Sequence, residues 1–171
     1  RPVHYERAID YADPSNTRHS DIYCPMYFHP SSCEKYLTLG FDFPLIQCEF
    51  AHSMGNSMGG LKEYMDLVRK YPQYQGGFIW DFVDQSVRWT GKNGKMIYAY
   101  GGDFNRFDAS DVNFCDNGLI SPDRVPNPHM YEVGYFYQNI WTNPANIKNG
   151  EISIFNEYFF RDLSAYYLEW Q

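Results

Sequence analysis

Four short apolar runs, each leading into polar or helical sequence, constrain the fold of this chain more than any other feature. The runs are PVHYE at residues 2–6, DIYCPMY at 21–27, PLIQCEF at 44–50 and GGFIWDFV at 76–83. Their apolar residues are nearly continuous, whereas a strand with one solvent-exposed face would alternate apolar and polar residues. The pattern therefore predicts parallel strands that are covered on both faces.

A helix is predicted between the third and fourth runs. In residues 57–71, SMGGLKEYMDLVRKY, apolar side chains recur at i, i+3, i+4 and i+7, which is the spacing of one helical face. These positions are Leu61, Tyr64, Met65 and Val68. Strand, helix and strand together make a β-α-β unit, and residues 31–40 predict a further short helix. The periodicity fits half of a parallel barrel and a four-stranded open sheet equally well.

Polar or aromatic residues stand where the predicted strands end. They are Glu6, Tyr27, Glu49, and Trp80 with Asp81. In parallel barrels and open sheets alike, the site lies at the carboxyl ends of the strands. A carboxylate at the end of a buried strand is costly unless it is hydrogen-bonded, paired or placed at a cavity. Glu49 is therefore a candidate site residue from its position alone.

The amino-acid composition of the sequence changes after residue 83. Clusters of Gly, Asn, Asp and Pro, such as GKNGK and YGGDFNRFDASD, predict long loops rather than helices or strands. From residue 146 onward, NIKNGEISIFNEYFF and LSAYYLEW alternate apolar and polar residues and are interrupted by Asn-Gly and Arg-Asp. This alternation predicts antiparallel strands of a second domain. We place the boundary between the two domains within residues 139–146.

Composition excludes some partners and leaves the compartment open. The chain of 171 residues has 14 basic and 21 acidic residues, a formal net charge of -7, which argues against a nucleic-acid partner because such proteins present a basic face. No apolar segment approaches the roughly 20 residues that a membrane span requires, and no signal peptide is evident. The chain starts at Arg1 without Met, so its natural start is expected to lie upstream. We expect a soluble protein, and cytoplasm and periplasm both remain open.

Cysteines and aromatic residues carry weaker signals. The four cysteines form no CxxC pair and have no histidine at zinc-finger spacing, which argues against a zinc site. Aromatic residues make up 19% of the chain. Such rings can stack on the apolar faces of sugars, but they are also good strand and core residues, and we expect core packing for most of them.

Several blocks of this sequence resemble the large bacterial β-galactosidases of glycoside hydrolase family 2. The resemblance rests on PLIQCEFAHSMGNSMGG, YPQYQGGFIWDFVDQS, YAYGGDF and NFCDNGL, and it runs through essentially the whole chain. It implies an α/β fold: the C-terminal half, strands 5 to 8, of a (β/α)₈ TIM barrel, followed by the first strands of a β-sandwich. Residues 1–140 would belong to the catalytic barrel and residues 141–171 to the sandwich.

The resemblance also implies roles for individual residues. Glu49 matches the catalytic nucleophile, and Tyr27 matches a tyrosine that orients it. The residues that match contacts to the galactosyl group are His52, Trp80, Met26 and Asn117. Phe114, through its backbone oxygen, and Asn117, through its side chain, match ligands of a sodium ion whose upstream aspartate is not in this chain. For Asp81, Asp84 and Asp103 we expect structural hydrogen bonds.

The chemistry that the resemblance implies is retaining hydrolysis of terminal β-D-galactosides such as lactose. One carboxylate attacks the anomeric carbon, and a second carboxyl group about 5 to 5.5 Å away protonates the leaving oxygen and later activates water. A tyrosine hydroxyl that donates to the nucleophile would aim it and keep it ionised. The family's acid/base glutamate and its magnesium ligands lie upstream of this chain. Glu6 is the nearest substitute, but the resemblance gives it no acid role.

We therefore expect the chain to be a fragment that is inactive on its own. Two alternatives remain: a non-catalytic module that binds galactosides, or a purely structural piece. Half a barrel exposes unpaired strand edges, so we expect association with the missing N-terminal half of a parent protein or with further copies of the chain as a homo-oligomer. The expected ligand is a β-galactoside sugar, without nucleic acid or membrane.

Overall fold

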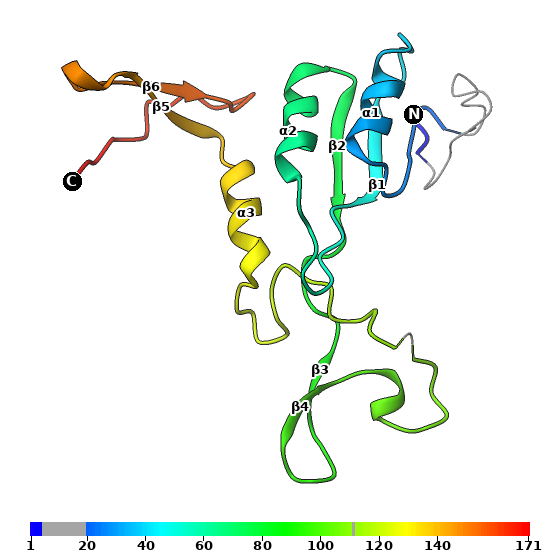
Figure 1. Cartoon of the computed structure of the whole chain (residues 1–171). Helices are drawn as coiled ribbons and strands as arrows, with labels where there is room; N and C mark the ends of the chain where they lie inside the picture. The colour runs from blue at the N-terminus through cyan, green and yellow to red at the C-terminus, as the bar shows by residue number, and fades with distance from the viewer. Residues whose placement is uncertain (5–19, 111) are drawn as a thin grey trace. The chain divides into compact units, whose positions relative to one another are not determined.

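The computed structural model describes residues 1–4, 20–110 and 112–171 of the chain. Glu6 lies outside these described residues, and so does part of the strand expected at residues 2–6. The chain divides into two compact units, Arg1–Val133 and Gly134–Gln171. Figure 1 shows the order of the helices and strands.

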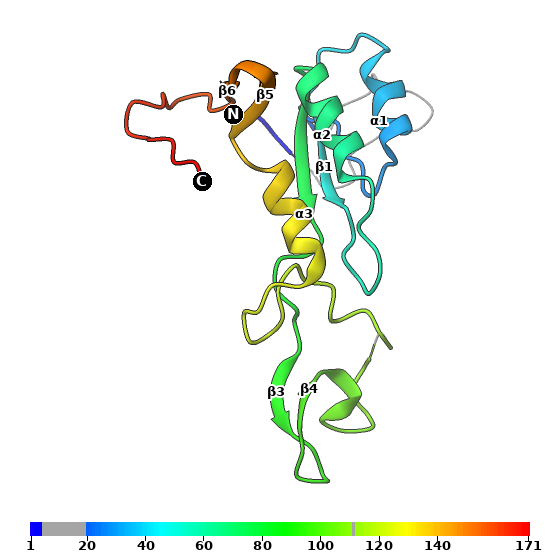
Figure 2. The ribbon, with the colours of Figure 1, turned by 60° about the vertical axis from the view of Figure 1, so that its left-hand side comes forward.

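The centre of the first unit is the β-α-β unit that the periodicity predicts. Strand β1 (Leu45–Phe50) and strand β2 (Tyr74–Ile79) pair in parallel, and helix α2 (Leu61–Lys70) connects them. Helix α1 (Pro30–Leu37) precedes β1 and packs against α2 (Figure 2). β2 ends four residues earlier than expected. Directly beyond β2, the Trp80 N–H still donates to the Phe50 carbonyl on β1 at 3.2 Å.

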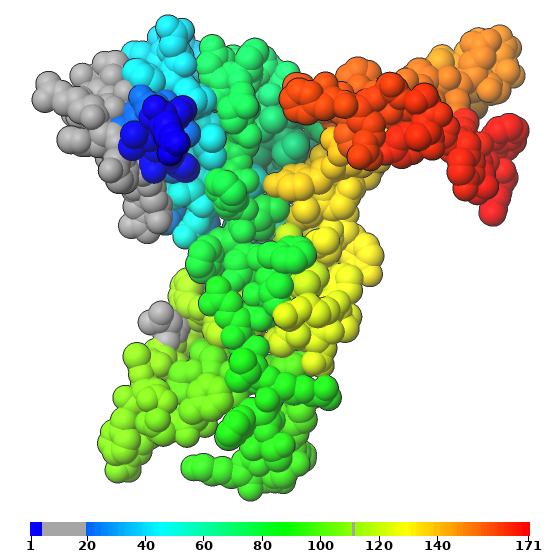
Figure 3. Space-filling model, turned by 180° about the vertical axis from the view of Figure 1, so that it is seen from behind, coloured from blue at the N-terminus to red at the C-terminus, as the bar shows by residue number. Residues whose placement is uncertain are grey.

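The core of this unit lies between the parallel strands and the two helices. Its side chains, less than 10% exposed, come from α1, β1, α2 and the start of β2: Cys33, Tyr36, Leu45, Phe50, Leu61, Tyr64 and Tyr74. The rings of Phe50 and Tyr64 meet edge to face at 5.2 Å between centroids. Viewed from behind in Figure 3, atoms of the blue-to-cyan segment lie directly against atoms of the green segment. This burial supplies most of the driving force for folding the unit.

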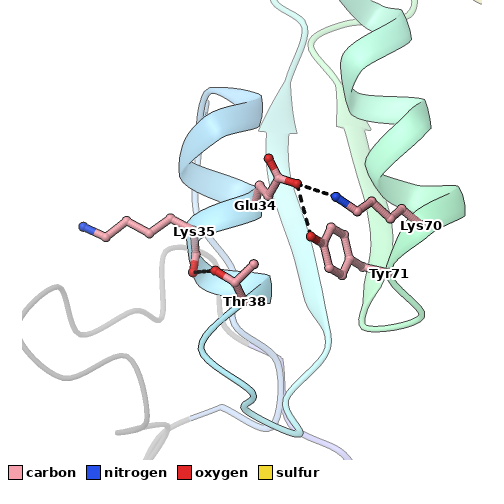
Figure 4. A network of polar contacts seen from close by, with 5 residues as sticks. All are labelled: Glu34, Lys35, Thr38, Lys70 and Tyr71. Atoms are coloured by element: carbon pink, nitrogen blue, oxygen red, sulfur yellow. Dashed lines mark hydrogen bonds and ion pairs between the residues drawn. The ribbon is translucent and has the colours of Figure 1, made fainter.

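A polar network on the surface joins α1 to α2. The Glu34 carboxylate accepts hydrogen bonds from Lys70 Nζ at 2.7 Å and from Tyr71 Oη at 3.1 Å (Figure 4). The nearby Lys70 ammonium lowers the pKa of Glu34 below its ordinary value. Because both side chains are exposed, this ion pair contributes little to the stability of the packing between the two helices.

The run at residues 21–27 does not form the continuous strand that was expected. It meets β1 at two isolated parallel bridges, Tyr23 with Leu45 and Met26 with Glu49. Hydrogen bonds still join the two segments on either side, from Cys48 N–H to the Pro25 carbonyl at 3.0 Å and from Tyr27 N–H to the Glu49 carbonyl at 2.8 Å. Pro25 has no N–H group, so the ladder lacks a bond at its centre.

Around the predicted loop clusters, the structure contains a hairpin and a helix that the sequence did not predict. Strands β3 (Val87–Thr90) and β4 (Met96–Ala99) form an antiparallel hairpin, followed by the short 3₁₀ helix η1 (Gly101–Asp103). Helix α3 (Pro128–Phe136) begins with a proline, which suits the first helical position. The Gly- and Asn-rich sequence GKNGK forms only the hairpin turn, and the flanking residues contribute the pairing.

The second unit contains an antiparallel pair of strands. Its second strand lies in the segment where the C-terminal alternation predicts one, whereas its first strand lies almost entirely before that segment. Strands β5 (Ile140–Asn146) and β6 (Glu151–Asn156) flank the 3₁₀ helix η2 (Ile147–Asn149), and the chain reverses at Gly150 with a φ of 72°. The segment LSAYYLEW, in contrast, forms no strand. Among the helices that the structure describes, none is both long enough and apolar enough to cross a membrane.

Candidate active site

Glu49 lies at the carboxyl end of β1, where it is half-buried and held by a tyrosine. The Tyr27 hydroxyl donates to Glu49 Oε2 at 2.6 Å, and the Tyr27 N–H donates to the Glu49 carbonyl at 2.8 Å. Burial, together with the hydroxyl's hydrogen bond to the Glu49 carboxylate, raises the pKa of Tyr27 well above its ordinary value. Tyr27 therefore stays protonated near neutral pH and acts as a donor to a carboxylate at a strand end.

His52 follows Glu49 by three residues and contacts two aromatic rings. Its imidazole meets the Tyr27 ring edge to face, with 5.6 Å between centroids, and lies 6.0 Å from the Phe114 ring. Ala51 has a φ of 49°, so the chain turns sharply after β1 and brings the imidazole back beside Tyr27. Three of the residues predicted for the site, Tyr27, Glu49 and His52, are thus brought together.

Trp80 and Met26 are placed next to the same strand ends. Trp80 follows β2 and is half-buried, and its backbone carbonyl accepts hydrogen bonds from Ser53 N–H at 2.9 Å and Ser53 Oγ at 3.1 Å. Met26 is half-buried and forms a parallel bridge with Glu49. The backbone therefore ties both residues to β1 or to the loop that follows it.

Asn117 is the most deeply buried of the predicted site residues, with 2% of its surface exposed. Its backbone carbonyl accepts from the Asp81 N–H at 2.9 Å and from the Ser53 hydroxyl. Its side-chain Oδ1 is buried and has no hydrogen-bond partner. A buried amide oxygen without a donor is unusual, and it is the type of ligand that a hard cation prefers. Asn117 therefore fits the implied sodium ion. The side chain of Phe114, whose backbone oxygen is the other implied ligand, is exposed.

The three aspartates for which structural hydrogen bonds were expected all make them. Asp81 Oδ2 accepts from Gln85 Nε2 at 2.7 Å, Asp84 Oδ1 accepts from the Gly118 N–H at 2.6 Å, and Asp103 Oδ2 accepts from the Tyr100 N–H at 3.1 Å. The other oxygen of Asp81 is buried without a partner, and burial raises the pKa of this carboxyl group above its ordinary value.

Ser53 joins the parts of the site, and the sequence reasoning missed it. It is 1% exposed, and it bonds the Trp80 carbonyl through its N–H and hydroxyl and the Asn117 carbonyl through its hydroxyl. It thereby links the loop after β1, the end of β2 and the segment that carries Asn117. Its position in the AHSMGN motif was the only available signal, because a serine by itself does not identify its partners.

Residues 1–142 match the sequence family described as glycosyl hydrolases family 2, TIM barrel domain. The chain therefore belongs to glycoside hydrolase family 2 and contains part of its α/β barrel domain, which confirms the resemblance seen in the motifs.

Several β-galactosidases are similar in sequence to this chain. The chain is 45% identical over 170 residues to one from Halalkalibacterium halodurans, covering 99% of this chain and 16% of that protein. It is 40% identical over 189 residues to one from Pseudoalteromonas haloplanktis, covering 100% of this chain and 18% of that protein. The chain thus spans less than a fifth of the length of these relatives. Among solved structures, a β-glucuronidase from Ruminococcus gnavus aligns with 78% of this chain and 25% of its own, at 11% identity and a TM-score of 0.49.

Proposed function

We propose that this chain is part of a retaining β-galactosidase and supplies its catalytic nucleophile. The observation that carries the proposal is the 2.6 Å hydrogen bond from the Tyr27 hydroxyl to Glu49 Oε2 at the carboxyl end of β1. In this proposal, residues 1–140 form strands 5 to 8 of the catalytic barrel and residues 141–171 begin a β-sandwich. The rest of the barrel comes from the N-terminal half of a longer polypeptide.

The reaction runs as a double displacement. One Glu49 carboxylate oxygen attacks the anomeric carbon of a terminal β-D-galactoside, and the bond from that carbon to the leaving oxygen breaks. A glutamate from the upstream half gives the leaving oxygen its proton and later takes a proton from the attacking water. The water then displaces Glu49, and galactose leaves with its original anomeric configuration. Tyr27 aims the carboxylate oxygen through both displacements.

The other site residues hold the sugar. His52, Trp80 and Met26 surround the galactosyl group, with Trp80 as an apolar wall for the ring. The Asn117 side-chain oxygen and the Phe114 carbonyl hold sodium, which supplies a positive charge for the sugar hydroxyls when bound. Magnesium is held by ligands in the upstream half. The alternative is that the chain binds galactosides without turnover or is purely structural, and the buried, unpartnered Asn117 Oδ1 favours the binding module over the structural piece.

Hydrolysis of an aryl β-galactoside by the longer polypeptide tests the proposal. Glu49→Gln should lower kcat by on the order of 10⁴-fold or more, the scale expected for loss of a covalent nucleophile. A matched control, Glu63→Gln on the exposed side of α2, should leave kcat within about 2-fold. A 2-deoxy-2-fluorogalactoside should label Glu49 in peptide mass spectra. Retention of activity by Glu49→Gln would remove Glu49 from the nucleophile role.

The isolated 171-residue chain provides a second test. It should show no turnover, because its acid/base group is elsewhere. Calorimetric titration with galactose then separates a binding module, which gives a saturable heat signal, from a structural piece, which gives none. Sedimentation at micromolar concentration should show self-association, or assembly when the upstream half is added. A well-folded monomer would contradict the expected need for a partner.

A further inference from the structure

The two peptide groups on either side of the Phe28 Cα, directly after Tyr27, are each held by a buried side chain. The Phe28 N–H donates to Gln47 Oε1 at 2.7 Å, and the Phe28 carbonyl accepts from the Tyr64 hydroxyl at 2.9 Å. Gln47 lies on β1 and Tyr64 on α2. Both side chains therefore connect the backbone next to Tyr27 to the most regular part of the first unit.

Gln47 is a polar side chain in an apolar position. It is 0% exposed, as are its core neighbours Leu45 and Leu61. An amide in such surroundings is unfavourable unless all of its polar atoms have partners. Gln47 meets this condition, because Oε1 accepts from Phe28 and Nε2 donates to the Tyr74 hydroxyl at 2.9 Å. The backbone N–H of Phe28 can only donate, which sets the orientation of the amide.

Tyr27 needs such support because its backbone conformation is unfavourable. Its φ of 53° lies in the left-handed region, where the Cβ of an L-residue crowds its own backbone. The Phe28 N–H belongs to the peptide plane that Tyr27 begins. Fixing that N–H on Gln47 therefore fixes the ψ angle of Tyr27, while the bond from Tyr27 N–H to the Glu49 carbonyl fixes the preceding plane.

The structure assigns to Gln47, supported by Tyr74, the role of a positioning residue that acts on Glu49 through Tyr27. The path runs from Tyr74 Oη to the Gln47 amide, to the Phe28 N–H, to the backbone of Tyr27, and from its hydroxyl to Glu49 Oε2. This inference rests on the proposed function, since it assumes that Glu49 is the nucleophile. It explains why an amide stands two residues before Glu49 in an otherwise apolar strand.

Replacement of Gln47 by leucine tests this role in the longer polypeptide. Leu has a similar size but no acceptor, so the Phe28 peptide can rotate and the Tyr27 hydroxyl leaves Glu49 for part of the time. We expect Gln47→Leu to lower kcat on an aryl β-galactoside by about 10- to 100-fold, the scale of a small misplacement of a reacting group. The KM should change by less than about 3-fold.

A double-mutant cycle separates positioning from a general loss of structure. If Gln47 acts through Tyr27, Gln47→Leu combined with Tyr27→Phe should have the same kcat as Tyr27→Phe alone. Tyr74→Phe should show a smaller loss, about 3- to 10-fold, that also disappears in the Tyr27→Phe background. The matched control is Tyr36→Phe, which removes another buried hydroxyl, bonded to the Phe43 carbonyl at 3.2 Å, and should leave kcat unchanged.

Each outcome supports or overturns the inference. Multiplicative losses in the double variant, or a folded Gln47→Leu variant with native kcat, would overturn it. If Gln47→Leu does not fold, the cycle of Tyr74→Phe with Tyr27→Phe decides in its place. Persistence of activity in Glu49→Gln would instead refute the proposed function. If Glu49→Gln abolishes activity but the losses of kcat from Gln47→Leu and Tyr27→Phe multiply, the positioning role of Gln47 is refuted and the proposed function stands.

Discussion

Substitution of Gly118 by alanine should destabilise the first unit through direct contact with backbone. A Cβ at this position would lie 2.2 Å from the Asp84 nitrogen, 2.5 Å from the Val83 carbonyl carbon and 2.9 Å from the Ile120 oxygen. Carbon atoms in contact normally lie about 3.5 to 4.0 Å apart. The two segments must therefore separate by about 1 Å, since backbone atoms cannot rotate away as a side chain does.

The magnitude follows from the bonds that this separation stretches. Overpacking of this kind costs about 1 to 3 kcal/mol. The segments are also joined by the bond from Gly118 N–H to the Asp84 carboxylate at 2.6 Å, and a bond to a charged group contributes about 1.5 to 3 kcal/mol. We expect Gly118→Ala to lower the free energy of unfolding by about 3 to 5 kcal/mol, allowing for partial relaxation.

Urea unfolding monitored by tryptophan fluorescence measures this loss, and two other glycines provide controls. Gly59 and Gly134 have no heavy atom within 4 Å of an added Cβ, and neither has a positive φ. Gly59→Ala should change the stability by less than about 1 kcal/mol. Gly134→Ala, inside α3, should stabilise by about 0.5 to 1 kcal/mol. A Gly118→Ala variant as stable as Gly59→Ala would refute the steric reasoning.

Two further predictions concern a thiol and the implied cation. Burial raises the pKa of the Cys33 thiol from 9.0 to about 11, so the folded state holds this proton to a higher pH than the unfolded state does. The contribution of the Cys33 thiol to stability is therefore complete below pH 9 and is lost between pH 9 and 11. Because Cys33 is buried and Cys115 is only half-buried, iodoacetamide at pH 8.5 should label Cys115 before Cys33 in mass spectra, and equal rates would contradict this. Asn117→Leu should raise the sodium concentration for half-maximal hydrolysis at least about 10-fold, and an unchanged sodium dependence would remove Asn117 from the cation site.

The local structure of the first unit was largely predictable, and the exceptions have physical reasons. The helical spacing in residues 57–71 predicted α2, because one apolar face must meet the core. The continuous strand expected at residues 21–27 did not form, since Pro25 removes a ladder donor. The β3–β4 hairpin was missed because its four-residue strands are too short to show an alternation against their turn-rich flanks.

The sequence by itself determined the family, the β-α-β order and the candidate carboxylate Glu49, because periodicity and motifs are local properties of a chain. Only the tertiary structure decided that the Tyr27 hydroxyl reaches Glu49, that Ser53 joins three segments, and that Gln47 holds the Phe28 peptide. These contacts join residues 19 to 64 positions apart. Which residues meet in these contacts depends on how the strands and helices pack in space, and local sequence patterns do not determine that packing.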